Sequence, residues 1–561
     1  MRMSASRLLS SAAALCLLAG AASPLFAKEI LILSEDVPAG LNYDGPSAAI
    51  PASQQGMVTL LEPLVGYAAA STNDTGVSVP DFNKFEGRLA ESWTFDPATL
   101  TWTFKLRQGV KGCDGATFNA DDVIYTFQRA KSVSGAAPIG WFLSNVGSIK
   151  GFGPEVFGGD AAAKDLGDAV TKVDDYTVVI KQGEPNTLFL PVLTIFGLLI
   201  FDKETMEANK TDADPWSHDY VNNTNAPGFG AYCLNSWTKN EEISYVANPD
   251  YFAGAPDIGK VTVKRVPQSS NRAVVLQTGQ AQLATGLTPR EFDSLRSAAG
   301  LKVGAVEGNE NTFLHMNFKT APFDNPLVRE AISHAIPFDQ IIANGYFGQA
   351  KQWQGMVPSS YPGYKASAAY TYDPAKAKEL LAEAGYPDGK GLEAFADAFR
   401  LSYVSEKEST LGPIVNIIQT ALREVGIPAT LDPIPQTQYG DRQLVKRDLP
   451  FAINDQEKPI GVDAGYAIQL FFVTGDKGGL NNMVNYSNPS EVDDAWAKAR
   501  IEPDTAKRDA ATAAIQDVLA RDVVWLPIVE YKTQWAHADK LSGLRWYPDN
   551  SLRYYDLKLA E

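Results

Sequence analysis

The first 27 residues fall into three zones of different polarity. A short basic start carries Arg2 and Arg7, an apolar stretch of about 15 residues follows at 8–22, and small residues lead to Ala27. This is the layout of a secretory signal peptide, and we expect cleavage after Ala27. The apolar stretch is shorter than the roughly 20 residues that span hydrocarbon, so a retained N-terminal anchor is the weaker alternative.

Beyond the signal, hydrophobic residues alternate with polar ones in several short runs. Residues 28–33 are typical of a buried strand, and apolar Trp102, Phe104 and Leu106 predict a half-buried strand over 101–106. Strands are also predicted over 173–181 and 260–266, and the C-terminal stretch 523–559 is again strand-like and aromatic.

Helical periodicity begins once at Asn119, where Asp122 three residues later predicts a capping box. It dominates the chain after about residue 285. Helix starts are predicted at Asn325-Pro326 and Asp373-Pro374, a third apolar stripe covers 414–425, and two more helices are expected between 490 and 522. Strands at both ends with a helix-rich block between them predict a chain that leaves one lobe, builds a second and returns.

The length supports more than one lobe. The chain has 561 residues, and the 534 that would remain after cleavage exceed what one hydrophobic core usually serves. An internal apolar stretch, residues 188–201, is interrupted by Pro191 and Gly197. We therefore expect it to be a buried core segment and not a membrane span.

Charge and cysteine usage narrow the compartment and the partners. The formal net charge is −17, and it becomes −19 when Arg2 and Arg7 leave with the signal. An exported chain this acidic is repelled by nucleic acid, so no nucleic-acid partner is expected. Cys113 and Cys233 permit one disulfide, and two separate buried thiols are an equal alternative.

Motifs for catalysis or metal binding are missing from the sequence. The four histidines, His218, His315, His334 and His537, have no metal-ligand spacing, so neither a metal nor a cofactor is predicted. There is no nucleophile elbow, phosphate loop or dinucleotide fingerprint. A secreted hydrolase that uses two carboxylates stays open as a function of another class.

Aromatic residues in polar, loop-like surroundings are the best candidates for ligand contact. Trp353 and Trp141 both lie in such segments, at 352–358 and 138–142. A ring on a loop can form the apolar wall of a binding site. Core packing is an equally good interpretation of each.

Four groups of segments, in order, resemble the ABC-transporter solute-binding proteins of family 5, the dipeptide and oligopeptide class. They are residues 89–96 with 102–110, 114–115 and 118–125; 228–232 with 248–252; 314–318 with 322–336; and 372–386. The resemblance covers nearly the whole chain beyond the signal. It implies an α/β fold of two lobes, a type II periplasmic binding protein of the venus-flytrap kind.

In this fold the ligand is enclosed between the lobes. The resemblance assigns 28–285 plus 522–561 to lobe I, with an extra subdomain at about 62–168, and 286–521 to lobe II. It also implies a periplasmic monomer whose closed form is recognised by an ABC permease in the inner membrane.

The resemblance also suggests where ligand would be held. In peptide-binding relatives an acidic residue of the second lobe pairs with the ligand's α-amino group. The matching stretch here, 453–459, places Asp455 at that position, and Asp463 is a competing alignment. Ser53 and Gln54 are candidate hydrogen-bonding residues of the cleft, and Tyr67 and Tyr486 are candidate ring faces.

The sequence therefore predicts a periplasmic protein that binds a small peptide or a similar amine-bearing solute. Binding of an oligosaccharide or an opine is the alternative within the same family. A member that scavenges metal or haem is a weaker possibility, because only four scattered histidines are present.

Overall fold

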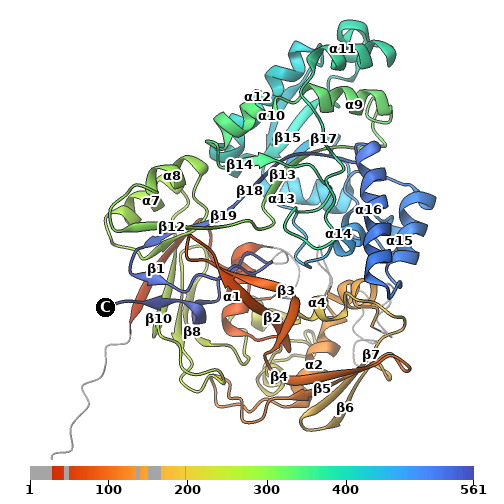
Figure 1. Ribbon diagram of the computed structural model, residues 1–561. Coiled ribbons are helices and arrows are strands. Elements are labelled where there is room, and N and C mark those ends of the chain that lie inside the picture. The colour runs from red at the N-terminus through yellow and green to blue at the C-terminus, as the bar shows by residue number, and fades with distance from the viewer. Residues whose placement is uncertain (1–27, 43–49, 134–138, 150–165, 196–197) are drawn as a thin grey trace, which may run out of the picture.

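The computed structural model describes residues 28–42, 50–133, 139–149, 166–195 and 198–561. The predicted signal peptide over 1–27 lies outside the described residues. Figure 1 shows two large sheets, one above the other, with helices packed around each. The C-terminus returns to the same sheet region as the first strand, so the discontinuous architecture is confirmed.

The lower sheet, which we call lobe I, has seven strands in the order β12-β19-β11-β1-β10-β9-β8. Its strand β1 pairs in parallel with β10 and β11, and the remaining pairs are antiparallel. The bounds are β1 Glu29–Ser34, β8 Tyr232–Thr238, β9 Glu242–Ala247, β10 Lys260–Arg265, β11 Leu283–Ala284, β12 Leu301–Val306 and β19 Thr533–Ala538. Helices α1 Pro51–Leu60, α7 Ser269–Gln277 and α8 Pro289–Leu295 accompany this sheet. The strands predicted at 28–33 and 260–266 are confirmed within one residue.

The upper sheet, lobe II, has six strands in the order β14-β18-β13-β17-β15-β16. They are β13 Asn311–Met316, β14 Ala350–Gln352, β15 Arg400–Val404, β16 Thr430–Ile434, β17 Phe451–Asn454 and β18 Trp525–Tyr531. Helices α9 Pro326–Ala335, α10 Phe338–Gln340, α11 Pro374–Glu383, α12 Glu408–Glu424 and α13 Gln436–Gly440 accompany it. The two predicted helix starts are confirmed, since Asn325 and Asp373 cap α9 and α11 through their side chains.

A smaller antiparallel sheet extends lobe I at the bottom of Figure 1. It contains β4 Ala90–Asp96, β5 Thr101–Leu106, β6 Val170–Asp174 and β7 Thr177–Lys181, beside the hairpin of β2 Val65–Thr72 and β3 Ser78–Gly87. Helices α2 Ala120–Ala130, α3 Ile139–Trp141, α4 Phe189–Leu193, α5 Lys203–Ala208 and α6 His218–Asn223 follow along the chain. The capping box of Asn119 and Asp122 is present. The strand predicted at 173–181 is instead the end of β6, a turn and β7, because Asp174 to Tyr176 reverse the chain.

The lobes are joined by two chain crossings. Strand β12 belongs to the lower sheet and β13 to the upper one, so the first crossing is residues 307–310; the second is Lys532, between β18 and β19. The division at 286 and 522 stays a prediction. Since β12 pairs with β19 in lobe I, we propose the two crossings as the lobe boundaries, and an extra subdomain that reaches β7.

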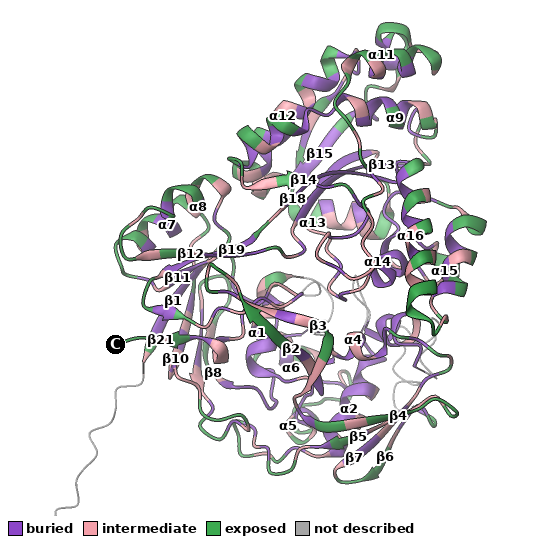
Figure 2. Cartoon of the chain, viewed as in Figure 1, coloured by how far each residue is buried: buried purple, intermediate pink, exposed green. Residues whose placement is uncertain are grey.

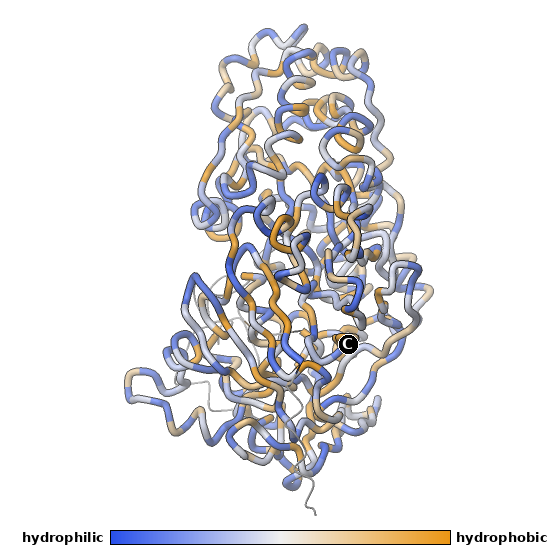
Figure 3. The backbone as a smooth tube through the Cα atoms, turned by 90° about the vertical axis from the view of Figure 1, so that its left-hand side faces the viewer, coloured by the Kyte–Doolittle hydropathy of each residue, from blue (hydrophilic) through white to orange (hydrophobic). Residues whose placement is uncertain are grey.

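Helices α14 Ala464–Phe471, α15 Asp494–Ala499 and α16 Thr505–Arg521 stand between the lobes at the right of Figure 1. Their buried residues, such as Tyr466, Trp496 and Leu519, belong to the same continuous apolar core as Ile30 and Phe104 of lobe I. Lobe II has a separate core. Figure 2 shows buried strands inside and exposed outer faces on α11 and α12, and Figure 3 shows hydrophobic positions running through both halves of an elongated body.

The bond between Cys113 and Cys233 ties the small subdomain to β8 of lobe I. The bridge spans 120 residues of sequence, so it restricts the unfolded chain strongly. We expect the double variant Cys113→Ala/Cys233→Ala to lose about 2–5 kcal/mol of unfolding free energy in urea titrations. Dithiothreitol should lower the unfolding free energy of the unmodified protein and leave that of the double variant unchanged. Equal unfolding free energies of the two proteins without reductant would contradict this prediction.

His315 lies on β13, is fully buried, and neither ring nitrogen has a hydrogen-bond partner among the described residues. Burial lowers its pKa from 6.5 to about 4. Between pH 6.5 and about pH 4, His315 is therefore protonated in the unfolded chain and neutral in the folded chain. The unfolding free energy therefore decreases as the pH falls through this range. Between pH 7 and pH 4.5, the unfolding free energy of His315→Leu should fall by about 2–3 kcal/mol less than that of the unmodified protein, as urea titrations at both pH values would show.

Candidate functional site

A polar hub sits where the chain first crosses between the lobes. The buried Asn309 amide donates hydrogen bonds to Tyr361 Oη at 2.9 Å, to the Pro459 carbonyl at 3.3 Å and to the Pro548 carbonyl at 2.7 Å. Pro459 belongs to lobe II, and Pro548 belongs to the segment that follows β19 of lobe I. One side chain thus fixes a loop from each lobe to the crossing.

The loop 455–463 of lobe II begins directly after β17. Asn454 Oδ1 accepts from the backbone N–H groups of Gln456 and Glu457, at 2.8 and 3.0 Å, and so shapes the turn. Asp455 is 5% exposed, and both its carboxylate oxygens lie 2.9 Å from Lys407 Nζ. The lysine follows β15, the strand that pairs in parallel with β17. This places an ion pair at the carboxyl ends of two adjacent strands.

Lobe I presents a carboxylate toward this ion pair. Glu35 follows β1, and burial raises its pKa, while the positive charges of Arg272 and Lys407 lower it. The negative charge of Asp455 also raises the pKa of Glu35. Since these interactions fall off with distance, charged groups of the two lobes face each other here.

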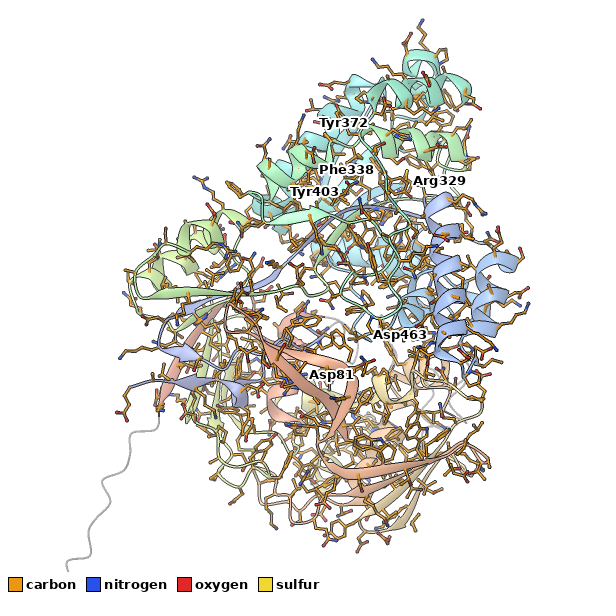
Figure 4. The ribbon with its side chains drawn as sticks, viewed as in Figure 1. Asp81, Arg329, Phe338, Tyr372, Tyr403 and Asp463 are labelled. Atoms are coloured by element: carbon orange, nitrogen blue, oxygen red, sulfur yellow. A yellow bond between two sulfur atoms is a disulfide. The ribbon has the colours of Figure 1, made fainter. Side chains whose placement is uncertain are left out.

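The other acidic residues of the loop have different surroundings. Burial raises the pKa of Glu457 to about 7 against the attraction of Lys458, whose ammonium pairs with Glu310. Asp463 caps α14, accepting from Gly465 N at 2.7 Å, and its other oxygen lies 3.6 Å from Arg508. Figure 4 shows Asp463 where the α14–α16 block approaches α4.

A pocket lies between this loop and lobe I. It is lined by Ile460 from lobe II and by residues of lobe I that include Tyr67, Tyr232, Tyr547, Tyr554 and two ion pairs. The pairs are Arg88 with Glu62, at 3.0 Å, and Arg553 with Asp549, at 2.8 Å. Because the charges are already paired, the pocket offers tyrosine faces and polar edges and has no free strong cation of its own.

Of four further predicted contact residues, Trp353, Tyr486 and Ser53 are buried in this conformation and Gln54 is partly exposed. Trp353 is 1% exposed, and its indole donates to Val357 O at 2.9 Å and packs on Phe313. Tyr486 donates to Asp522 Oδ2 at 2.8 Å. Ser53 and Gln54 lie on α1; Ser53 is buried, with its hydroxyl unpartnered within the described residues. The loop 43–49 just before α1 lies outside the described residues. The ligand contacts of these four stay predictions.

Tyr67 and Trp141 both reach the interface between the lobes. Tyr67 lines the pocket, and burial and the charge of Asp463 raise its pKa. The Trp141 indole donates to the carbonyl oxygen of Gly478 at 3.0 Å, and Gln469 Nε2 donates to the same oxygen at 2.7 Å. An added Cβ on Gly478 would meet the Asn145 side chain, so glycine is needed at this close approach.

Two arginines extend this interface. Arg500 forms an ion pair with Glu184 and donates to the Asn145 carbonyl at 3.4 Å. Arg508 donates to Thr187 Oγ1. We call this set the interlobe clasp: Trp141, Asn145, Glu184 and Thr187 of lobe I, with Gly478, Arg500 and Arg508 on the other side. It lies by α15 and α16, while the crossings lie beside β12 and β19 (Figure 1).

Several residues of the site were not predicted from the sequence. They are Lys407, Glu35, Glu457, Arg500 and Arg508. No local motif marks Lys407 or the arginines, because each acts with a distant residue: Lys407 with Asp455, 48 residues along the chain, and Arg500 with Glu184 of lobe I. Within the described residues there is no cluster of three or more potential metal ligands. None of the helices described is long and apolar enough to cross a bilayer.

Comparison with known proteins places this geometry in context. A family model described as bacterial extracellular solute-binding proteins, family 5 Middle, matches residues 84–477. A curated relative, the glutathione-binding protein GsiB of Escherichia coli O1:K1 / APEC, is 27% identical over 481 residues, which are 85% of this chain and 86% of the relative.

Solved structures share the fold. The periplasmic binding protein DppA from Helicobacter pylori, in complex with the peptide STSA, matches with a TM-score of 0.75 and 24% identity, covering 95% of this chain and 98% of DppA. MoaA from A. tumefacien R10, in complex with mannopinic acid, matches with a TM-score of 0.75 and 23% identity, covering 95% of this chain and all of MoaA. The predicted two-lobed α/β fold is confirmed.

The clasp predicts a shift between closed and open forms. Removing the half-buried charge pair with Arg500→Ala should favour separation of the lobes by about 1 kcal/mol. Small-angle scattering of the ligand-free protein should then show a larger radius of gyration. The exposed pair of Lys446 and Asp441 lies within lobe II, so Lys446→Ala is the control and should leave the radius unchanged. Equal radii for both variants would contradict the clasp, and the exchange Arg500→Glu/Glu184→Arg should restore the smaller radius.

Proposed function

Since the chain belongs to the bacterial extracellular solute-binding proteins of family 5, we propose that it is the periplasmic receptor of an ABC importer. Its ligand is a small peptide or a similar amine-bearing solute, held between the two lobes. The partner is a permease of the inner membrane, and the predicted signal peptide supports export to the periplasm. The chain binds its solute without transforming it.

The observation that carries this proposal is the excess of negative charge between the lobes. Four carboxylates, Asp455, Glu457, Glu310 and Glu35, face three cations: Lys407 pairs with Asp455, Lys458 pairs with Glu310, and the charge of Arg272 acts on Glu35. Asp455 is buried and Glu457 and Glu310 are partly exposed, whereas Glu35 is exposed to solvent. A carboxylate that is buried or partly buried is stabilised by a positive partner or becomes protonated. A ligand ammonium group supplies that partner.

The placement of these carboxylates also explains how ligand would close the lobes. Glu35 is on lobe I, and the other three follow strands or crossings of lobe II. A cation between them is attracted to both lobes at once, so its contacts are made in full only in the closed form. Relatives named for glutathione and for peptides support an amine-bearing ligand.

An opine is the second candidate, favoured by the tyrosine-lined pocket of lobe I. Tyrosine hydroxyls and the edges of paired Arg and Asp side chains can accept and donate hydrogen bonds to a hydroxylated chain. An opine carries such a chain next to an amine, and MoaA in complex with mannopinic acid has the same fold.

The proposal is tested with protein purified from the periplasm. Native mass spectrometry should show one retained solute per chain, and calorimetry should show one-to-one binding to a member of a panel of glutathione, Met-Leu, the tetrapeptide STSA and mannopinic acid. N-acetylation of the panel member that binds should lower its affinity at least tenfold, because the ammonium charge is lost. Binding that ignores acetylation would overturn the amine, and turnover of any member would overturn a purely binding role.

A further inference from the structure

We propose that Glu457, and not Asp455, is the carboxylate that holds the ligand's amine in this protein. This inference rests on the proposed function and names the residue that carries it. The three acids of the loop 455–463 differ in one respect that decides between them, namely whether their charge is already matched by the protein.

Asp455 is matched. Both of its oxygens lie 2.9 Å from Lys407 Nζ, and the carboxylate is almost fully buried. A ligand amine could reach it only by displacing the lysine, which would leave that ammonium without its partner. Such an exchange of one cation for another gains little.

Asp463 is matched as well. One oxygen accepts the Gly465 N–H at the start of α14, and the other faces Arg508. Its carboxylate is thus part of a helix cap and of the interlobe clasp. Using it for ligand would weaken both.

Glu457 is different. Within the described part of the chain its side chain makes no hydrogen bond and no ion pair, and the neighbouring Lys458 is engaged by Glu310. The turn that presents it is fixed by Asn454 Oδ1, so its position is set before ligand arrives. Glu457 is partly exposed, and the burial of its carboxylate raises its pKa to about 7.

A second unmet polar group lies close by. Tyr466 of α14 is buried, and its hydroxyl has no hydrogen-bond partner among the described residues. Burial raises the pKa of Tyr466, with smaller contributions from Tyr361 and from the charge of Glu457. A ligand that carries an ammonium group and a second polar group would supply partners to both side chains.

The first arm of the test needs no ligand. At pH 8 an unpaired, half-buried carboxylate destabilises the fold, so Glu457→Gln should raise the thermal midpoint by roughly 2 °C. Asp455→Asn breaks the pair with Lys407 and should lower it. If Glu457→Gln lowers the midpoint as Asp455→Asn does, Glu457 has a partner in the protein and the inference is overturned.

The second arm is a cycle between protein and ligand, measured by calorimetry with glutathione and N-acetylglutathione, or with Met-Leu and N-acetyl-Met-Leu. Glu457→Gln should lower the affinity for the ligand with a free amine at least tenfold, and should change the affinity for the acetylated ligand by less than twofold. Asp455→Asn should weaken both forms equally. Coupling to acetylation at Asp455 in place of Glu457 would overturn the inference and leave the proposed function standing, whereas binding insensitive to acetylation in all three proteins would overturn both.

Discussion

The structure depends on one buried amide, that of Asn309, which holds a loop from each lobe against the first of the two chain crossings. Asn309 sits on the first crossing and holds the carbonyls of Pro459 and Pro548, one from each side. Asn550 in turn donates to Asn309 Oδ1 at 2.8 Å and to Glu310 at 3.0 Å. A buried amide must keep its partners or lose about 1–3 kcal/mol for each group left unpaired. The first crossing, the loop 455–463 and the segment around Pro548 are therefore held together as one unit.

This constraint explains why charge is gathered on that loop. Its backbone position is fixed by the hub at one end and by the Asn454 turn at the other. Lys407 and Lys458 neutralise two carboxylates of the site. What is left over is a fixed negative potential facing Glu35 of lobe I, and repulsion between like charges opposes closure until a cation enters.

Local signals in the sequence were enough for the capped helices and for several strands, but they did not predict α1, α7, α8 or α14. Caps at Asn119, Asn325 and Asp373 act within three residues, and the family resemblance supplied the two-lobed fold. The strands of lobe II between 286 and 521 were missed, because β13, β15 and β17 are buried on both faces and show no alternation. Of the site, the acidic loop was found, but the pairing of Asp455 with Lys407 joins residues 48 apart, which no pattern in one sequence reveals.

The interlobe clasp and the acidic site oppose each other, and their balance sets how the protein would sense its solute. The clasp favours closure through Arg500, Arg508 and Trp141 without touching the acidic loop's free carboxylate. The negative charges at Glu35 and Glu457 favour opening. If the clasp were much stronger, the lobes would close without ligand, and a permease could not distinguish the loaded receptor from the empty one. If it were much weaker, most of the free energy of ligand binding would be needed to close the lobes. In a receptor that responds to its solute, the free energy by which the clasp favours closure and the free energy by which the charges favour opening differ by only about a few kcal/mol. One bound cation then determines whether the lobes are open or closed.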